Sequence, residues 1–257
     1  MSTFELDLDK IDETNLKCYD ILAHEYDDVE HETCRDFDYC NKKFLNYAIK
    51  NDFKFINKLR YLDVGVGTGK AIEYLLDWLI KMNAQIEVLD ISSKMLEITQ
   101  EKFGNYIDKS HNLSIHNFKA TNKYDLISAI MCDPYLTYKS IEIFKNSLTE
   151  NGVLLLSFPS NSWAKIVRGK SITEAVFHNK NKEKHISYSF CMNKLDLNNL
   201  TKENNLIWRY SKLYLLDDKI TETGYLSKIN QALYNKEKRV PMLFTLIIYN
   251  KLNEHNL

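Results

Sequence analysis

The stretch from Arg60 to Lys70, which reads RYLDVGVGTGK, constrains the fold of this chain more than any other. Apolar and β-prone residues run up to Val64, glycines then occupy every second position, and apolar residues at helical density follow from Ala71 to Ile80. That succession predicts a buried strand, a tight glycine turn and the start of a helix. Glycine allows positive φ angles and lets a ligand approach the backbone closely. We therefore expect a ligand cradle at this turn.

The spacing of the glycines indicates which kind of ligand the cradle holds. A dinucleotide-binding turn has glycines at positions 1, 3 and 6 and presents a helix N-terminus to a pyrophosphate. Here Gly65, Gly67 and Gly69 fall at positions 1, 3 and 5, and Asp63 precedes the first by two residues. A carboxylate aimed into the cradle would repel a pyrophosphate but would suit an ammonium group. The alternative is an ordinary strand–helix turn, although three of the seven glycines in 257 residues are gathered here.

A second carboxylate follows the next expected strand. Asp90 comes directly after the β-prone run Gln85–Leu89, 21 residues beyond the last glycine of the turn. In a doubly wound sheet the tip of the second strand neighbours the first turn, so Asp90 can accept hydrogen bonds from a ribose diol. Ile91 and Met95 stand at helical spacing and could face a base. The alternative interpretation of Asp90 is a turn residue at the end of a strand.

At RYLDVGVGTGK and VLDISSKML the chain resembles the class I S-adenosylmethionine-dependent methyltransferases of the small-molecule type. The resemblance implies S-adenosyl-L-methionine as the methyl donor and S-adenosyl-L-homocysteine as the product. It assigns the amino-acid end of the cofactor to Asp63 and the glycine backbone, the ribose to Asp90, and the adenine to Ile91, Met95, Asn117 and Phe118. In full, the residues that it assigns to cofactor binding are Tyr26, Asp63, Gly65, Val66, Gly67, Asp90, Ile91, Met95, Asn117, Phe118 and Met131.

Two of these assignments depart from the family pattern or have an alternative. The family usually has an acidic residue where this chain has Asn117, whose amide oxygen can still accept a hydrogen bond. The segment YDILAHEYDDV resembles the N-terminal helix of such enzymes, in which a tyrosine often covers the methionine end of the cofactor. We carry that role to Tyr26, with Tyr19 as the second choice. A tyrosine that packs the helix onto the core is the alternative, because helical apolar stripes usually mean burial.

The remaining pattern predicts an α/β fold with a doubly wound, seven-stranded sheet whose last strand is antiparallel. Expected strands after the second are Leu113–His116, Tyr124–Met131, Val153–Phe158, Leu206–Leu216 and Pro241–Tyr249. The last two are adjacent without a full crossover helix, which favours antiparallel pairing. We expect a single domain over residues 1–257, with a helical lid (1–55), a cofactor-binding core (56–159), a cap insertion (160–192) and the C-terminal part of the sheet (193–257).

No residue stands out as catalytic, and three are weak candidates. Asp133 follows the fourth strand in Cys-Asp-Pro-Tyr, which has a faint similarity to a motif of amino-group methyltransferases. Its alternative role is the N-cap of a helix with Pro134 at the first position. Two β-prone runs, Ile172–His178 and His185–Cys191, flank a polar turn and predict a hairpin over the acceptor. His178 and His185 could act there as bases, although solvated hairpin residues are the simpler interpretation.

Composition excludes several other classes of protein. The formal net charge is −1, and the first 40 residues hold 13 Asp and Glu against three Lys and Arg, which makes nucleic-acid partners unexpected. No apolar run approaches a membrane span and no secretory signal is apparent, so we expect a cytoplasmic protein with no membrane partner. The five cysteines suit reduced thiols. His31 and Cys34 have no C-x-x-C partner elsewhere, so no metal site is expected.

The predicted function is therefore methyl transfer from S-adenosylmethionine to a small-molecule O or N acceptor. The extra length of the chain is spent on a lid and a cap rather than on an appended RNA- or protein-binding module. A protein or RNA methyltransferase, or a non-catalytic cofactor-binding protein of the same fold, are the alternatives. Neither the acceptor nor the oligomeric state follows from the sequence.

Overall fold

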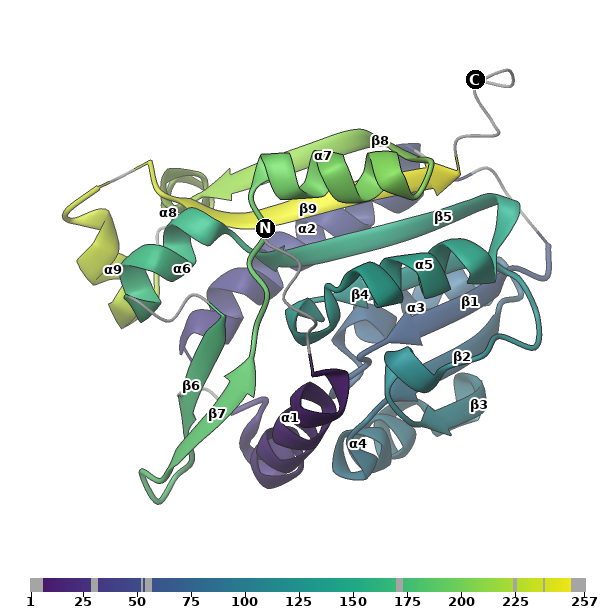
Figure 1. Ribbon diagram of the computed structural model, residues 1–257, viewed down its shortest axis with the longest axis horizontal. Coiled ribbons are helices and arrows are strands. Elements are labelled where there is room, and N and C mark those ends of the chain that lie inside the picture. The colour runs from purple at the N-terminus through teal and green to yellow at the C-terminus, as the bar shows by residue number, and fades with distance from the viewer. Residues whose placement is uncertain are drawn as a thin grey trace.

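The computed structural model describes residues 7–28, 32–51, 53, 57–169, 173–223, 226–237 and 239–250. Within these residues, seven strands form one sheet in the order β3-β2-β1-β4-β5-β9-β8 (Figure 1). Their bounds are β1 Arg60–Val64, β2 Gln85–Asp90, β3 Ile107–Asn112, β4 Tyr124–Ile130, β5 Leu148–Pro159, β8 Leu206–Leu215 and β9 Pro241–Asn250. A separate two-stranded hairpin consists of β6 (Glu174–His178) and β7 (Lys184–Tyr188).

The strand pairing confirms the predicted fold class. Strands β3, β2, β1, β4 and β5 pair in parallel, whereas β9 runs antiparallel to both β5 and β8. The order reverses between β1 and β4, because the chain builds outward from β1 to β3 and then returns to the other side of β1. The carboxyl ends of strands beside such a reversal form a crevice in which open α/β sheets bind ligands.

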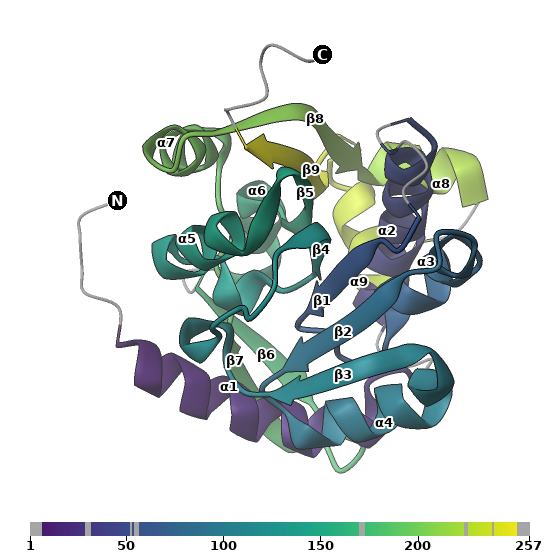
Figure 2. The same ribbon diagram turned by 90° about the vertical axis from the view of Figure 1, so that its right-hand side faces the viewer.

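Helices cover both faces of the sheet (Figure 2). The helices are α1 Leu8–Leu22, α2 Glu32–Asn51, α3 Lys70–Lys81, α4 Ser93–Phe103, α5 Tyr138–Ser147, α6 Asn161–Arg168, α7 Lys194–Glu203, α8 Leu216–Thr223 and α9 Lys228–Tyr234. One apolar core joins α2 and α3 to the sheet, and a second joins α5 and α7 to its other face. Two-sided burial explains why β4 reads as a nearly continuous apolar run.

The glycine turn forms as the sequence predicts. Gly65, Gly67 and Gly69 have φ angles of 62°, 54° and 84°, which side-chain-bearing residues rarely adopt. A Cβ at Gly65 would come within 2.4 Å of the Cys132 Sγ, so this position also has no room for a larger residue. Helix α3 begins directly after the turn, and its buried face, which includes Leu75, packs into the first core.

The predicted third strand was wrong in position. Leu113–His116 is not a strand; β3 lies earlier, at Ile107–Asn112, and residues Ile115–Asn117 form a 3₁₀ turn. Strand β3 is the edge of the sheet and pairs only with β2, so its side chains are mostly exposed and carry no apolar pattern. Ile115 is apolar because it is buried beneath the 3₁₀ turn. The apolar signal therefore marked a core contact rather than a strand.

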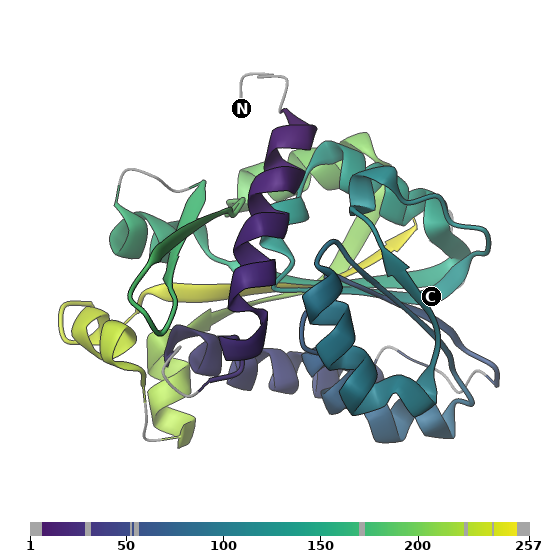
Figure 3. The same cartoon turned by 90° about the horizontal axis from the view of Figure 1, so that it is seen from below.

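Helix α1 and the hairpin form a common cover over the crevice. Figure 3 shows α1 between the β6–β7 hairpin and α4. On the hairpin side, the Asn15 Oδ1 accepts a hydrogen bond from the Tyr188 backbone N–H at 2.8 Å. On the other side, the Ser92 Oγ donates to the Asp20 Oδ1 at 2.5 Å. The hairpin expected around residues 172–191 is present over a shorter range, and Ile172 lies outside the described residues.

Candidate functional site

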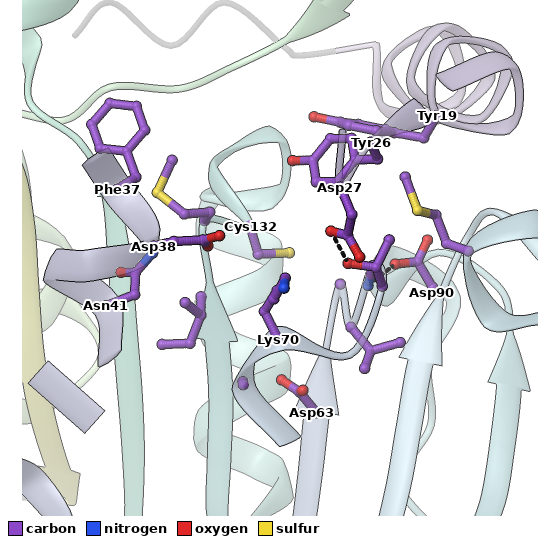
Figure 4. Close-up of a pocket in the computed structure, with 18 of the residues that line it drawn as sticks. Tyr19, Tyr26, Asp27, Phe37, Asp38, Asn41, Asp63, Lys70, Asp90 and Cys132 are labelled. Atoms are coloured by element: carbon purple, nitrogen blue, oxygen red, sulfur yellow. Dashed lines mark hydrogen bonds between the residues drawn. The ribbon is translucent and has the colours of Figure 1, made fainter. Parts of the chain in front are cut away.

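A cavity of about 250 Å³ lies at the carboxyl ends of β1, β2 and β4, directly over the glycine turn. We call it the first cavity. Tyr19 and Tyr26 extend over it from the N-terminal segment, opposite Asp63 (Figure 4). Nine of the residues assigned to cofactor binding line it: Tyr26, Asp63, Gly65, Val66, Gly67, Asp90, Ile91, Met95 and Met131. Residues that are 105 positions apart in the sequence are thus brought to one place, at the point where the strand order reverses.

Asn117 and Phe118 do not belong to the lining of the first cavity. Asn117 ends the 3₁₀ turn, and the Phe118 ring is buried with its edge against His111, at 5.2 Å between ring centroids. The shift of the third strand accounts for this placement, because Asn117 is the last residue of a 3₁₀ turn and Phe118 follows it, so neither lies at a strand tip.

Asp63 carries an acceptor atom that no described residue uses. The side chain is buried, and its Oδ1 accepts a hydrogen bond from the Ser128 Oγ at 2.5 Å. Ser128 is in turn 2.7 Å from the Tyr61 hydroxyl, so the carboxylate is held in one orientation. The Oδ2 atom is also buried but has no hydrogen-bond partner among the described residues. Burial raises the pKa of Asp63 to about 7, and the hydrogen bond from Ser128 opposes that rise.

Asp90 is tied to the glycine turn. Its Oδ2 accepts a hydrogen bond from the Gly67 N–H and its Oδ1 accepts one from the Ser92 N–H, each at 2.9 Å. These bonds fix the carboxylate at the wall of the cavity while leaving each oxygen further lone pairs. Burial raises the pKa of Asp90 to about 6, and the two backbone N–H groups oppose the rise. Ser92 also caps α4 by accepting from the Met95 N–H at 3.1 Å.

The first cavity has an acidic wall, in which Asp27 pairs with Lys102 at 2.6 Å and Asp28 with Lys180 at 2.8 Å. Its lining holds one cationic side chain, Lys70, within the described residues, and that lysine pairs with Glu73 at 3.1 Å. The lining carboxylates are Asp27, Asp28, Asp38, Asp63 and Asp90. Such a wall attracts a ligand with a net positive charge and disfavours a polyphosphate.

A second cavity, of about 690 Å³, adjoins the first beneath the hairpin. The two share the lining residues Tyr19, Tyr26, Asp28, Phe37 and Met131. Its other walls come from α6, from the hairpin and from the 3₁₀ turn Asp133–Tyr135 that follows β4. The volume is in the range of small-molecule sites in proteins, ~300–1,000 Å³.

The three candidate catalytic residues have different positions. Asp133 and His178 line the second cavity, whereas His185 lines neither cavity and has a buried Nε2 without a partner among the described residues. Asp133 is buried, and its Oδ2 accepts a hydrogen bond from the Ser189 Oγ. Asp133 lies in a 3₁₀ turn, and the N-cap of α5 is Thr137 instead. The prediction that Asp133 caps this helix is therefore wrong.

Several lining residues were missed by the sequence reasoning. Helix α6 was not predicted, and it supplies Trp163 and Arg168 to the second cavity. Helix α6 has only eight residues, which is shorter than the length at which periodicity alone identifies a helix. Phe37 and Asp38 of α2 line the first cavity as well, although the same helical stripe packs onto the core. The acidic bias of the first 40 residues was the available sign that this segment meets a cationic ligand.

Two expected absences concern only part of the chain. Among the described residues no cluster of three or more His, Cys, Asp or Glu could hold a metal ion. The possible metal ligands His31 and Cys34 lie outside the residues whose side chains are described. No helix in the described ranges has both the length and the apolar character that a membrane span needs.

Comparisons with known proteins agree with the fold and with the first cavity. Residues 62–152 match a family model described as a methyltransferase domain. No curated protein matches the chain. Among solved structures, an S-adenosylmethionine-dependent methyltransferase from Clostridium acetobutylicum superimposes with a TM-score of 0.60 at 18% identity, covering 91% of this chain and 99% of the other. A DhpI–SAH complex gives a TM-score of 0.59 at 12% identity, with coverage of 93% and 97%.

A third similar structure is a putative sarcosine dimethylglycine methyltransferase from Galdieria sulphuraria, with a TM-score of 0.56, 14% identity, and coverage of 83% of this chain and 86% of the other. At these identities the structural likenesses speak for the fold, while the family match covers the glycine turn, Asp90 and the strands beside them. Residues 62–152 thus match a methyltransferase domain, and the chain has the fold of S-adenosylmethionine-dependent methyltransferases.

Proposed function

We propose that the chain transfers a methyl group from S-adenosylmethionine to the O or N atom of a small molecule held in the second cavity. The observation that carries this proposal is the pair of adjoining cavities with a shared wall of Tyr19, Tyr26, Asp28, Phe37 and Met131. Two ligands placed in these cavities would meet at that wall. Adjacency of this kind is what a direct transfer between two bound molecules requires.

The first cavity fits the cofactor in charge and in hydrogen bonding. The buried Asp63 Oδ2 lacks a donor among the described residues, and an ammonium group in the cavity would supply one. At Gly67 an added Cβ would meet only the Gly65 carbonyl oxygen, at 3.9 Å, so the cradle is open toward the ligand. Asp90 would accept from the ribose hydroxyls. Ile91 and Met95 supply apolar surface beside it.

The cofactor, when bound, supplies a methyl group on a positively charged sulfur. The residues of this chain therefore need to bind, orient and shield rather than activate the donor. Asp63 would fix the amino-acid end of the ligand and Asp90 its ribose, and the acidic wall would favour its positive charge. Tyr19 and Tyr26 would shield the reacting atoms from water, because both rings line the first cavity and pack edge to face with 6.1 Å between their centroids.

A small acceptor is favoured over a macromolecule because the second cavity lies beneath the cover formed by α1 and the hairpin. That cover is held at several points, including a hydrogen bond from the Lys180 N–H to the Glu25 Oε2 at 2.7 Å. A folded protein or an RNA duplex would need an open groove instead. The Galdieria sulphuraria structure of the same fold is described as a putative sarcosine dimethylglycine methyltransferase, which supports a small acceptor here.

We also propose that residues 1–257 act as one domain in the cytoplasm. The lid, the cap and the core share the walls of the two cavities, which supports a single functional unit. The described cysteines Cys18, Cys40, Cys132 and Cys191 are free and buried, which suits a reducing compartment.

Two measurements test the proposal. Isothermal titration is expected to show micromolar binding of S-adenosylhomocysteine and no binding of NADH. Tritiated S-adenosylmethionine is then incubated with the protein and, in separate arms, with a metabolite extract, bulk RNA or whole protein. Label is expected in the metabolites. Label only in RNA or only in protein would show that the acceptor is that macromolecule and not a small molecule. Label in none of the three would indicate a cofactor-binding protein that does not turn over.

A further inference from the structure

Asp133 lies close to the point where the two cavities meet. It follows Met131 and Cys132, which line the first cavity, and it lines the second cavity itself. Its backbone carbonyl accepts a hydrogen bond from the Phe190 N–H at 3.0 Å, which ties the end of β4 to the chain that leaves the hairpin. The carboxylate is buried, so it is one of the few ionisable groups at the inner end of this cavity.

Ser189 and Arg168 form a chain of hydrogen bonds that ends on Asp133. The Arg168 Nη1 donates to the Ser189 Oγ at 2.6 Å, and the Ser189 Oγ contacts the Asp133 Oδ2. Arginine can only donate, so the serine oxygen accepts from Arg168 and its single proton can be donated to the ionised Asp133 carboxylate. The direction of the chain therefore presents a hydrogen-bond donor to the carboxylate. Burial raises the pKa of Asp133, and Arg168 and Ser189 both oppose that rise.

The inner wall of the second cavity suits a cationic acceptor. The pair of Tyr19 and Phe177 faces it, at 6.2 Å between ring centroids, whereas the Phe37–Trp163 pair already has the Arg168 guanidinium over its Trp163 ring, at 5.5 Å. Aromatic faces attract a cation within ~6 Å of a ring. The basic groups of this cavity are engaged or remote: the Lys180 Nζ pairs with Asp28 at 2.8 Å, and Arg168 stacks over Trp163. Lys182 is exposed in the turn of the hairpin.

Resting on the proposed function, we infer that Asp133 takes a proton from a primary or secondary amine acceptor that enters the second cavity as an ammonium ion. We infer further that Ser189 and Arg168 are the positioning residues that orient the Asp133 carboxylate and keep it able to accept that proton. The nitrogen then forms a bond to the methyl carbon as the sulfur–carbon bond breaks, and the electron pair of that bond stays on sulfur. The proton leaves Asp133 for solvent, so the charges balance.

The first test measures the titration of Asp133 without any acceptor. Infrared difference spectra of the full chain, recorded from pH 4 to pH 10, report the protonated carboxyl stretch, and Asp133→Asn assigns the Asp133 band. Arg168→Met and Ser189→Ala are each expected to raise the midpoint by about one pH unit, a tenfold change in proton affinity. Lys165→Met removes a positive charge from an exposed site on the same helix and is expected to leave the midpoint in place.

The outcomes of this test are distinct. An unchanged midpoint in Arg168→Met and Ser189→Ala, with S-adenosylhomocysteine binding intact, would overturn the positioning role. A wild-type midpoint above about pH 9 would overturn the proton-accepting role, because Asp133 would then already carry its proton at neutral pH. Arg168→Lys keeps the charge but not the planar fork, and it is expected to give a midpoint between the wild-type and Arg168→Met values.

The second test identifies the class of the acceptor. The metabolite extract is treated with acetic anhydride in bicarbonate, which acylates primary and secondary amines, and is then offered with tritiated S-adenosylmethionine. The label is expected to be lost relative to mock-treated extract, because the nitrogen lone pair of an acylated amine is no longer available for methyl transfer. Undiminished label would overturn the amine assignment while leaving the proposed methyl transfer intact. If the Asp133→Asn variant labelled the untreated extract at the wild-type rate, the proposed role of Asp133 would be overturned.

Discussion

The Asn15 side chain on α1 is hydrogen-bonded to the Tyr188 backbone N–H on β7, across 173 residues of sequence. Asn15 is fully buried, so this contact is shielded from water. It joins the N-terminal helix to the hairpin and makes one cover out of two segments that the sequence presents as separate features.

Replacing Asn15 by leucine is expected to lower the free energy of unfolding by about 1–3 kcal/mol, because the Tyr188 N–H is left buried without an acceptor. Denaturant titration measures the loss, and hydrogen exchange at Tyr188 should become faster. Glu13→Ala, at an exposed site on the same helix, is the matched control. Equal stability of both variants would show that the joint between α1 and β7 contributes nothing.

Asp90→Ala is expected to weaken S-adenosylhomocysteine binding by about 1.5–3 kcal/mol, the range for hydrogen bonds to a charged group. Isothermal titration provides the number. Asp77→Ala removes an exposed carboxylate from α3 and serves as the control, since it should leave the affinity unchanged. If Asp90→Ala bound the ligand as tightly as the wild type, Asp90 would not be the ribose acceptor.

The stability of the free protein is expected to fall as the pH rises through the range in which Asp90 and Asp63 titrate. Their pKa values are raised by burial from 3.8 to about 6 and about 7. The folded state therefore holds protons that the unfolded chain has released. The resulting stabilisation is complete below pH 3.8 and is lost as the pH passes about 6 and then about 7. Thermal unfolding of the wild type and of Asp63→Asn measures it, and the upper part of the change should vanish in the variant.

Binding of S-adenosylhomocysteine is expected to have the opposite dependence on pH. An ammonium group beside Asp63 favours the ionised carboxylate, so binding should tighten between about pH 6 and about pH 8 and release a proton. Titrations in two buffers with different ionisation enthalpies count that proton. Asp63→Asn should bind more weakly and without proton release from this site. If the affinity of the wild type for S-adenosylhomocysteine did not change over this pH interval, the ammonium group would not lie beside Asp63.

Phe177→Ala is expected to reduce methyl transfer to the extract at least fivefold, an estimate of about 1 kcal/mol for the lost aromatic wall, with S-adenosylhomocysteine affinity preserved. Phe177 lines the second cavity only. Ile186→Ala, on the other strand of the hairpin and outside both linings, is the control for the stability of the cap. Parallel losses of transfer in the two variants would mean that the hairpin acts through its fold and not through this ring.

The features that were predicted from sequence are those fixed by local chemistry. The turn at Gly65 and Gly67 needs positive φ angles that few residues other than glycine adopt. Asp90 ends β2, which pairs in parallel with β1, the strand that leads into this turn. The feature that was missed at the edge of the sheet has no such local cause. Strand β3 exists because β2 offers it a row of backbone partners, and its own side chains are largely exposed.

The second cavity was predictable only in outline. Its position after β5 followed from the change of pattern beyond residue 160, but its chemistry depends on tertiary contacts. The contact of Arg168 with Ser189 brings together a helix and a strand end that are 21 residues apart, and Asp133 is 56 residues from Ser189. No periodicity in a single sequence encodes pairs of this kind.

The double attachment of α1 has a kinetic consequence. The helix is held to the hairpin through Asn15, and to the core through Asp20, which accepts from the Ser92 Oγ, and through Asp12, whose Oδ1 is 3.1 Å from the His116 Nδ1. Lifting it therefore exposes both cavities at once, whereas loosening either attachment alone leaves the helix tethered. We expect spent cofactor and methylated product to depart through one shared opening event, whose frequency sets an upper limit on turnover.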